Sequence, residues 1–589
     1  MKQIVITRHG SEAWDNLSAK ETDGDFDYEK DSADMAKRIE AARCKGALTS
    51  PDPDTYGSAA DPFDSDFSNR PSTDLLSQPH VELVRRWSEE CAITHTACQS
   101  VKLEQQLPTR VLKILSSSSG EVESISLFEA RGEKGTYAAL SYCWGMTPQL
   151  EKTTTENLAR HLEVILLKDL PNTIADAIRL CHRLGFHYLW VDALCIIQDD
   201  LADWTREAAS MCDVYGNAAL TLVTSLVGDS SESFIEARRN GSLSSEVMAE
   251  ILFTNPKSGL PGGLWVFWDF FPDGPWVLEN DWNNISGRER NPYEWLGRAW
   301  CFQEWVLSPR ILHIHEQTLW DCFEGYASEL SCRHVGPTNL RRDLRRAGDQ
   351  VTLWSNIVAE FTSRAITKAS DRLPALAGLA VAYSNATGRQ TYLAGLWFEN
   401  LPLELLWDAG SPFDDDPHPR TPSFSWVSLN APVTFHDNKL TYRAKFDIKC
   451  SVISWSCQDD GDTIWTRRNV TIELEGRLSR FNGAAPPHGI PYDKWTANFD
   501  REDEVVGSGV VEGEMYLFLV VGGHHFFRHY EWRALVLRKV GSEDGMDSFR
   551  RIGVATIRLQ HYDKENPPET PPATAECDEP WERRSVRLR

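Results

Sequence analysis

Two acidic residues of the sequence lie inside strongly apolar surroundings. Glu304 interrupts the run WCFQEWVL that begins at Trp300, and Asp192 directly follows the apolar residues 189–191. A carboxylate in such a place must find hydrogen-bond partners or shift its pKa. Held in a water-poor pocket, it can stabilise positive charge that develops in a reaction. Glu304 and Asp192 are therefore candidate catalytic residues. The structural alternatives are an exposed helical position for Glu304 and a loop-capping role for Asp192.

Three cysteines lie near these carboxylates and offer a second chemistry. Cys143, Cys195 and Cys301 each fall in an apolar block. A nucleophilic thiolate needs a nearby base or cation, and no histidine lies close in sequence to any of the three. We expect them to be buried thiols. A Ser–His–Asp hydrolase is not indicated either, because the G-x-S-x-G turn is absent.

The cysteine pattern predicts neither a disulfide framework nor a metal site. The 13 cysteines are odd in number and scattered without regular spacing. Cys91 and Cys98 lie close together, but no second pair accompanies them at zinc-ligand spacing. We expect mostly free, buried thiols in a reducing compartment, with no metal ligands and no cofactor.

Composition excludes some classes of partner. A chain of 589 residues predicts two or three domains. The net charge of −25 and the pI of about 5.1 argue against nucleic acid and anionic membrane surfaces as partners. Apolar runs such as Met515–Val521 are too short to span a bilayer, and the start lacks a secretory pattern. We expect a soluble, cytoplasmic protein.

Strand and helix patterns alternate through the region that carries the candidate residues. The predicted strands are 137–142, 188–191, 219–224 and 311–314. The predicted helices are 155–166, one capped by Asn172 or Thr173 and stopped by Gly185, one capped by Asp203, and 298–307. This alternation predicts an α/β fold with a parallel sheet and right-handed crossovers.

Ligands of open parallel sheets bind beyond the carboxyl ends of the strands. Three such ends can be located, at residues 141–145, at Asp192 and at Ser225. The first end supplies the candidate substrate-binding residues Ser141, Tyr142, Trp144 and Gly145.

The chain divides into five segments by composition. Residues 1–78 are rich in Asp, Ser and Pro and are predicted to be disordered, and the last residues are rich in Pro and Glu. The segments are an acidic disordered segment at 1–78, lead-in strands and a helix at 79–136, an α/β domain at 137–312 with an insertion at about 228–292, a helical then β-rich domain at 313–565, and a loose tail at 566–589.

Three blocks in fixed order resemble the heterokaryon-incompatibility (HET) domain of fungal proteins. They are residues 137–145 (YAALSYCWG), 170–218 and 298–310 (RAWCFQEWVLSPR). Weaker resemblance continues to about residue 554. The resemblance implies a role in non-self recognition and programmed cell death, with self-association or another incompatibility protein as a partner.

HET domains resemble Toll/interleukin receptor (TIR) domains, which have a flavodoxin-like fold and in some members cleave NAD. The TIR catalytic glutamate lies in a Trp-Cys-x-x-Glu motif, and Trp300-Cys301-x-x-Glu304 has that form. The resemblance thus implies NAD as a substrate, Glu304 as the catalytic residue, and Trp144 or Trp300 as a stacking surface.

Two other functions remain open from the sequence. A non-catalytic, self-assembling signalling or adaptor module is the main alternative to an enzyme. The segment around Arg8-His9-Gly10 is similar to the start of a histidine phosphatase, but the acidic residues that follow do not continue that fold.

Overall fold

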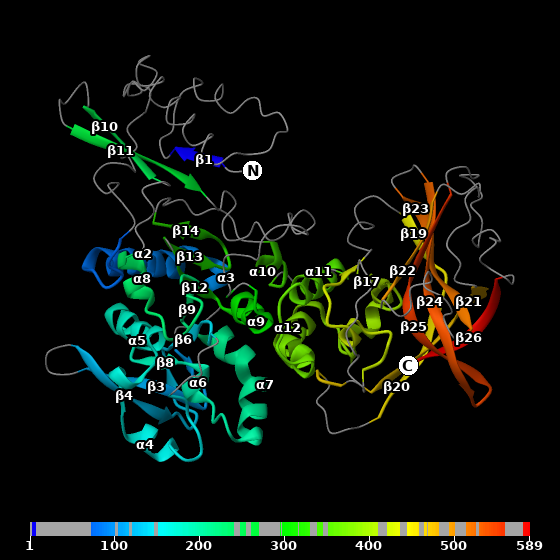
Figure 1. Cartoon of the computed structure of the whole chain (residues 1–589), viewed down its shortest axis with the longest axis horizontal. Coiled ribbons are helices and arrows are strands. Elements are labelled where there is room, and N and C mark those ends of the chain that lie inside the picture. The colour runs from blue at the N-terminus through cyan, green and yellow to red at the C-terminus, as the bar shows by residue number, and fades with distance from the viewer. Residues whose placement is uncertain are drawn as a thin grey trace.

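The computed structural model has an α/β part at one end and a β-rich part at the other, with helices α11 and α12 between them (Figure 1). The structure describes residues 3–6, 72–99, 104–116, 121–145, 151–240, 248–254, 261–269, 295, 297–315, 317–329, 339–345, 351–409, 421–435, 445–458, 465–467, 469–481, 494–500, 514–525, 529–559 and 581–589. Most of the predicted disordered segment and the Arg8-His9-Gly10 motif lie outside these residues.

The α/β part is built on a nine-stranded sheet with the order β14-β13-β12-β9-β6-β8-β3-β4-β7. The strands are β3 (Arg110–Ser116), β4 (Val122–Glu129), β6 (Ala138–Ser141), β7 (Ile165–Leu166), β8 (Tyr188–Trp190), β9 (Leu220–Thr224), β12 (Arg310–Ile314), β13 (Thr318–Cys322) and β14 (Tyr326–Ser328). The α/β class is confirmed.

The predicted parallel sheet forms only the middle of a larger, mixed sheet. Only the four central strands, β12-β9-β6-β8, are parallel to one another. The strands on both flanks pair antiparallel, because β3 and β4 form one hairpin and β12, β13 and β14 form a meander. If the four parallel strands are numbered by their order in the chain, their order across the sheet is 2-1-3-4 (β8-β6-β9-β12). The direction of winding therefore reverses between β6 and β9.

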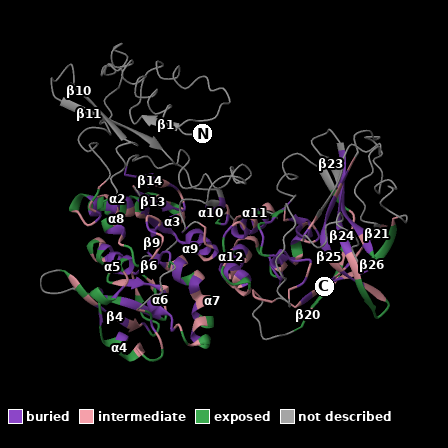
Figure 2. Cartoon of the chain, viewed as in Figure 1, coloured by how far each residue is buried: buried purple, intermediate pink, exposed green. Residues whose placement is uncertain are grey.

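Helices cover both faces of the sheet. On one face Leu222 and Leu312 pack in a cluster with Trp87 and Ile178, and on the other Val223 and Ile311 pack with the α9 helix. The helices are α2 (Gln78–Thr94), α3 (Thr96–Gln99), α4 (Leu158–Glu163), α5 (Asn172–Leu184), α6 (Asp192–Cys195), α7 (Leu201–Asn217), α8 (Phe234–Asn240), α9 (Ala299–Leu307), α10 (Asn339–Asp343), α11 (Val351–Thr362) and α12 (Arg372–Thr387). The strands between them are buried (Figure 2).

Two helix ends show how the sequence sets the boundaries. Helix α5 stops at Gly185, whose φ of 95° is the left-handed conformation that glycine adopts readily. Its N-cap is Pro171 rather than the predicted Asn172 or Thr173. Helix α7 is capped by Asp200, whose side chain accepts from the backbone N–H groups of residues 202 and 203, so the prediction of Asp203 as the cap was wrong.

The β-rich part is an eight-stranded sheet whose pairing path closes on itself, since β21 pairs with both β26 and β23. Its strands are β19 (Lys445–Ile448), β20 (Ser451–Cys457), β21 (Val470–Phe481), β22 (Lys494–Phe499), β23 (Met515–His525), β24 (His529–Glu543), β25 (Met546–Leu559) and β26 (Glu582–Leu588). The predicted loose tail differs from the structure at its end, because β26 pairs with β21 and β25.

The remaining described strands form four small sheets. They are β1 (Gln3–Ile6) with β11 (Pro261–Asp269) and β10 (Met248–Thr254), β2 (Gln105–Gln106) with β5 (Lys134–Gly135), β15 (Tyr392–Leu393) with β16 (Leu396–Trp397), and β17 (Trp407–Asp408) with β18 (Thr434–Phe435). The N-terminal strand β1 therefore pairs with the predicted insertion. None of the helices in the described part of the chain is long and apolar enough to cross a membrane.

Candidate active site

The candidate site lies at the carboxyl ends of the parallel strands. Ser141 is the last residue of β6, and its hydroxyl donates a hydrogen bond to Glu304 Oε2 from helix α9. The indole Nε1 of Trp295 donates to Ser141 Oγ at 2.7 Å. Ser141 is 1% exposed and Glu304 is 7% exposed. Strand β6 and helix α9 thus bring together two candidate residues that are far apart in the sequence.

The second candidate carboxylate, Asp192, is held at the end of β8. Its Oδ2 accepts from Trp144 Nε1 at 2.8 Å, and its Oδ1 accepts from the backbone N–H of Ala193 at 2.7 Å. Asp192 and Trp144 are both only partly buried. The loops after β6 and β8 are therefore joined by a side-chain hydrogen bond at the same rim of the sheet.

The loop after β6 also contacts the loop after β9. The carbonyl of Trp144 accepts from Ser230 Oγ at 3.0 Å. Gly145 has a φ of 80°, and a Cβ added there would lie 2.0 Å from Asp229 Oδ2. Gly145 is thus required by a left-handed turn and a close approach, which is a structural reason for its presence.

Burial raises the pKa of Glu304 to about 7. Asp192 raises it further, whereas the Ser141 hydroxyl and the Arg298 guanidinium act in the opposite direction. Burial also raises the pKa of Asp192, against the hydrogen bond from Trp144. Among the described residues, neither carboxylate has an Arg or Lys within ion-pair distance. A carboxyl group that titrates near neutrality can act as an acid, a base or an electrostatic stabiliser.

The two remaining predicted site residues differ in their contacts. Tyr142 is buried, its carbonyl accepts from Arg298 Nη1 at 3.1 Å, and its side chain hydrogen-bonds to Asp192, which lowers the pKa of that carboxyl group. Trp300 is partly buried and packs against both large hydrophobic clusters of the protein.

Sequence reasoning missed three residues of the site: Trp295, Arg298, and Tyr215 of α7, whose side chain hydrogen-bonds to Glu304. Trp295 lies in a Trp-rich stretch whose spacing gives no signal, and it also packs edge-on against His313 with ring centroids 5.9 Å apart. Arg298 begins the third apolar block and precedes α9, so a cation next to the Trp-Cys-x-x-Glu run was a signal that could have been used.

The cysteines near the rim are not activated thiols. Burial raises the pKa of Cys195 to about 12 and raises that of Cys301 well above its ordinary range. Nearby Glu304 raises the pKa of Cys301 further. The expectation of buried thiols agrees with the burial of Cys143, Cys195 and Cys301. Thiolate catalysis at this rim is therefore disfavoured.

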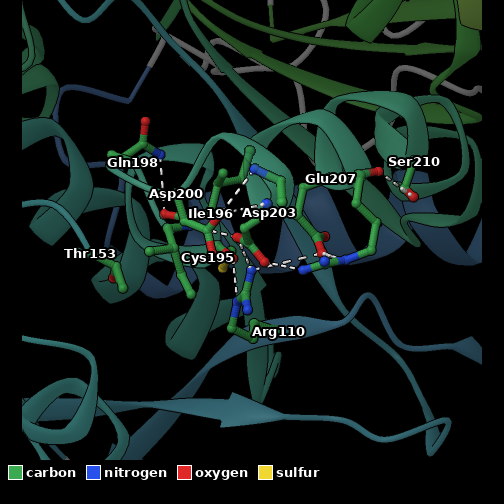
Figure 3. Close-up of polar contacts among 12 residues, drawn as sticks. Arg110, Thr153, Cys195, Ile196, Gln198, Asp200, Asp203, Glu207 and Ser210 are labelled. Atoms are coloured by element: carbon green, nitrogen blue, oxygen red, sulfur yellow. Dashed lines mark hydrogen bonds and ion pairs between the residues drawn. The ribbon is translucent and has the colours of Figure 1, made fainter. Parts of the chain in front are cut away.

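A network of charged side chains beneath the rim holds the segment that follows Asp192 (Figure 3). Arg110 of β3 donates to the Cys195 carbonyl at 2.7 Å and forms an ion pair with Asp203 of α7. Asp203 also accepts from the backbone N–H of Ile197 at 2.8 Å, and Glu207 lies 3.7 Å from Arg110. The network fixes α6 and its loop between the sheet and α7.

The α/β part that carries the candidate site was compared with known protein families. An α/β sheet with polar groups at its carboxyl edge is common to many proteins, but residues 137–304 match the family model for "Heterokaryon incompatibility protein (HET)". The matched segment contains β6, β8, β9 and Glu304, and the sheet extends beyond it on both flanks. The chain therefore contains a HET domain, as the three sequence blocks predicted. The curated proteins gave no match, and neither did the solved structures.

Proposed function

We propose that this protein acts in HET-type non-self recognition and programmed cell death of a fungus, and that its rim site hydrolyses NAD. The observation that carries the proposal is the contact between Ser141 and Glu304 at the carboxyl end of a parallel strand, with the pKa of Glu304 raised to about 7. The family match supports the cellular role.

The strand order supports a flavodoxin- or TIR-like ancestry. The order 2-1-3-4 of the parallel strands corresponds to the first four strands of the flavodoxin-like order 2-1-3-4-5. In such sheets the ligand site lies where the winding reverses, which here is between β6 and β9. Ser141 ends β6 at that point.

In the proposed reaction, the bond between the ribose C1′ and the nicotinamide nitrogen breaks, and the electron pair leaves with nicotinamide. Water adds to C1′ and loses a proton, which gives ADP-ribose. The ribose carries positive charge in the transition state, and the ionised Glu304 stabilises it. The partly exposed Trp144 and Asp192 would meet the substrate first.

The alternative is a non-catalytic, self-assembling signalling module. It is favoured by the burial of Glu304, a residue that is 7% exposed and whose carboxylate already accepts from Ser141. NAD can reach Glu304 only if the contacts among Trp295, Ser141 and Glu304 rearrange. Self-association of the chain could supply that rearrangement.

The test is nicotinamide release from NAD by the full chain, alone and after forced dimerisation. We expect turnover that Glu304→Gln abolishes, because the amide keeps the shape but loses the charge. Glu163→Gln, the same change at an exposed position on α4, should leave turnover unchanged. Absence of turnover in both states, with folded protein, would favour the signalling module.

A further inference from the structure

Four metal-binding side chains from distant parts of the chain meet outside the candidate active site. Cys91 lies in the last turn of α2, His95 directly follows that helix, Cys98 lies in α3, and Cys322 ends β13. Their donor atoms all lie within 4.8 Å of one another. His95 Nδ1 and Cys322 Sγ are 3.2 Å apart. The sequence suggested no metal site because Cys322 is remote from the other three.

We propose that Cys91, His95, Cys98 and Cys322 bind a structural zinc ion. Three thiolates and one imidazole are a common ligand set for tetrahedral zinc, with Zn–S distances of about 2.3 Å and Zn–N distances of about 2.0 Å. Four protein ligands leave no open position for a substrate, so the ion is structural. The proposal does not depend on NAD hydrolysis.

The backbone already holds the three local ligands near each other. The N–H of His95 donates to the Cys91 carbonyl at 3.2 Å, and the N–H of Cys98 donates to the His95 carbonyl at 3.1 Å. These bonds turn the chain between α2 and α3, so that Cys91, His95 and Cys98 face the end of β13. The three cysteines are completely buried.

A buried cation next to the cluster supplies the charge that such a site needs. A zinc ion with three thiolates and a neutral imidazole carries a net charge of −1. Arg310 of β12 is the register partner of Cys322, and its Nη2 donates to the Cys98 carbonyl at 3.0 Å. Its Nε and Nη1 have no hydrogen-bond partner among the described residues, although the side chain is 2% exposed. An anionic zinc–thiolate centre would offset the cost of burying this charge.

Second-layer contacts hold the remote ligand against the other three. The backbone of Phe323 hydrogen-bonds to the Cys98 thiol, and the N–H of Cys322 donates to the Gly325 carbonyl at 2.9 Å. Glu324 accepts from the Thr96 hydroxyl at 3.0 Å and from the backbone N–H of Ala97. Such contacts orient ligands around structural zinc. The ion would fasten α2 and α3 to the edge of the HET-domain sheet.

A disulfide is the competing chemistry for three neighbouring thiols. It would join two sulfurs and leave the third thiol and His95 without a role. All three cysteines are free in the structure. The convergence of a histidine with three thiols favours zinc, and the experiment separates the two chemistries.

The test is the metal content of the full chain, purified under reducing conditions without a metal-affinity tag. We expect about one zinc per chain, as for a closed four-ligand site. Cys322→Ala should lose the zinc, and Cys181→Ala, which removes a buried thiol in α5 outside the cluster, should keep it. Folded wild-type protein without stoichiometric metal, or equal zinc in Cys322→Ala, would overturn the proposal.

A second measurement holds even if Cys322→Ala does not fold. Wild-type protein stripped of metal and loaded with cobalt(II) should show the strong visible absorption of tetrahedral thiolate coordination. A weak, octahedral spectrum would contradict the site. Mass spectrometry that finds a disulfide between two of the three cysteines in freshly purified, unstripped protein would also contradict it.

Discussion

Two groups of carboxylates in the α/β part differ in whether an arginine forms an ion pair with them. Beneath the rim, Asp203 and Glu207 face Arg110. Burial acts to raise the pKa of Asp203, but Arg110, the backbone N–H of Ile197 and Arg206 together outweigh it and lower that pKa. At the rim, Glu304 and Asp192 have hydrogen-bond donors but no ion-pair partner in the described part of the chain, and burial raises the pKa of both.

This difference distinguishes carboxylates that stabilise the fold from carboxylates that can exchange a proton in a reaction. A carboxylate that is neutralised by a guanidinium is fixed in one protonation state, so it can hold elements together but cannot exchange a proton near neutral pH. A carboxylate that is buried without such a partner costs stability, and that cost is typical of sites selected for reactivity. The comparison therefore favours the rim, rather than the Arg110 network, as the location of the proposed reaction.

The largest predicted effect is on the supporting network. Arg110→Met removes the buried cation that Asp203 and Glu207 share and leaves them only the largely exposed Arg206, so we expect the free energy of unfolding to fall by about 3 kcal/mol. Urea denaturation at neutral pH measures this change. A fall below about 1 kcal/mol would mean that the Arg110 network does not stabilise the domain and would remove the contrast with the rim.

The second prediction concerns the pH dependence set by Glu304. Its folded-state pKa lies above the ordinary value of 4.5, so its stabilising contribution is complete below pH 4.5 and is lost as the pH rises to about 7. Over that range the free energy of unfolding of the wild type should fall by about 3 kcal/mol because of Glu304, and Glu304→Gln should not show this fall. The measurement is the free energy of unfolding of both proteins from acid to alkaline pH. Parallel curves for the two proteins would show that Glu304 titrates normally.

A third, smaller effect is predicted for Ser141→Ala. The change leaves Trp295 Nε1 without its acceptor and removes a donor to Glu304, at a cost of about 1–3 kcal/mol. Because the Ser141 hydroxyl lowers the pKa of Glu304, the loss of stability should also move to higher pH. Ser210→Ala, which removes a hydroxyl at the surface of α7, is the control and should shift neither quantity.

The smallest effect is predicted for an exposed ion pair of the same domain. Arg131 is 82% exposed and lies 3.0 Å from Glu129. Arg131→Ala should change the free energy of unfolding by less than about 1 kcal/mol, because solvent screens the pair. A change as large as that of Arg110→Met would mean that burial is not what distinguishes these networks.

Local sequence patterns predicted much of the α/β part. Apolar periodicity placed α5 between residue 172 and Gly185, and apolar runs located β6, β8, β9 and β12 to within two residues. The antiparallel flanks could not be predicted, because strand direction depends on pairing between distant segments. Because these contacts also join distant segments, the sequence could not predict Trp295 as a partner of Ser141 or Cys322 as a neighbour of Cys91. The exchange of Asp203 for Asp200 as the α7 cap shows that two acidic residues three apart cannot be told apart by spacing.

The order of the strands in the sheet has a consequence for synthesis of the protein. The ribosome delivers β6, β8 and β9 first, but the strand that pairs with the free edge of β9 is β12, which follows the whole segment between Thr224 and Arg310. Until Ile314 has emerged, the nascent chain presents an unpaired, apolar strand edge that can pair with another chain. Chaperone binding would protect this edge during that interval, whereas slow translation of the intervening segment would prolong its exposure.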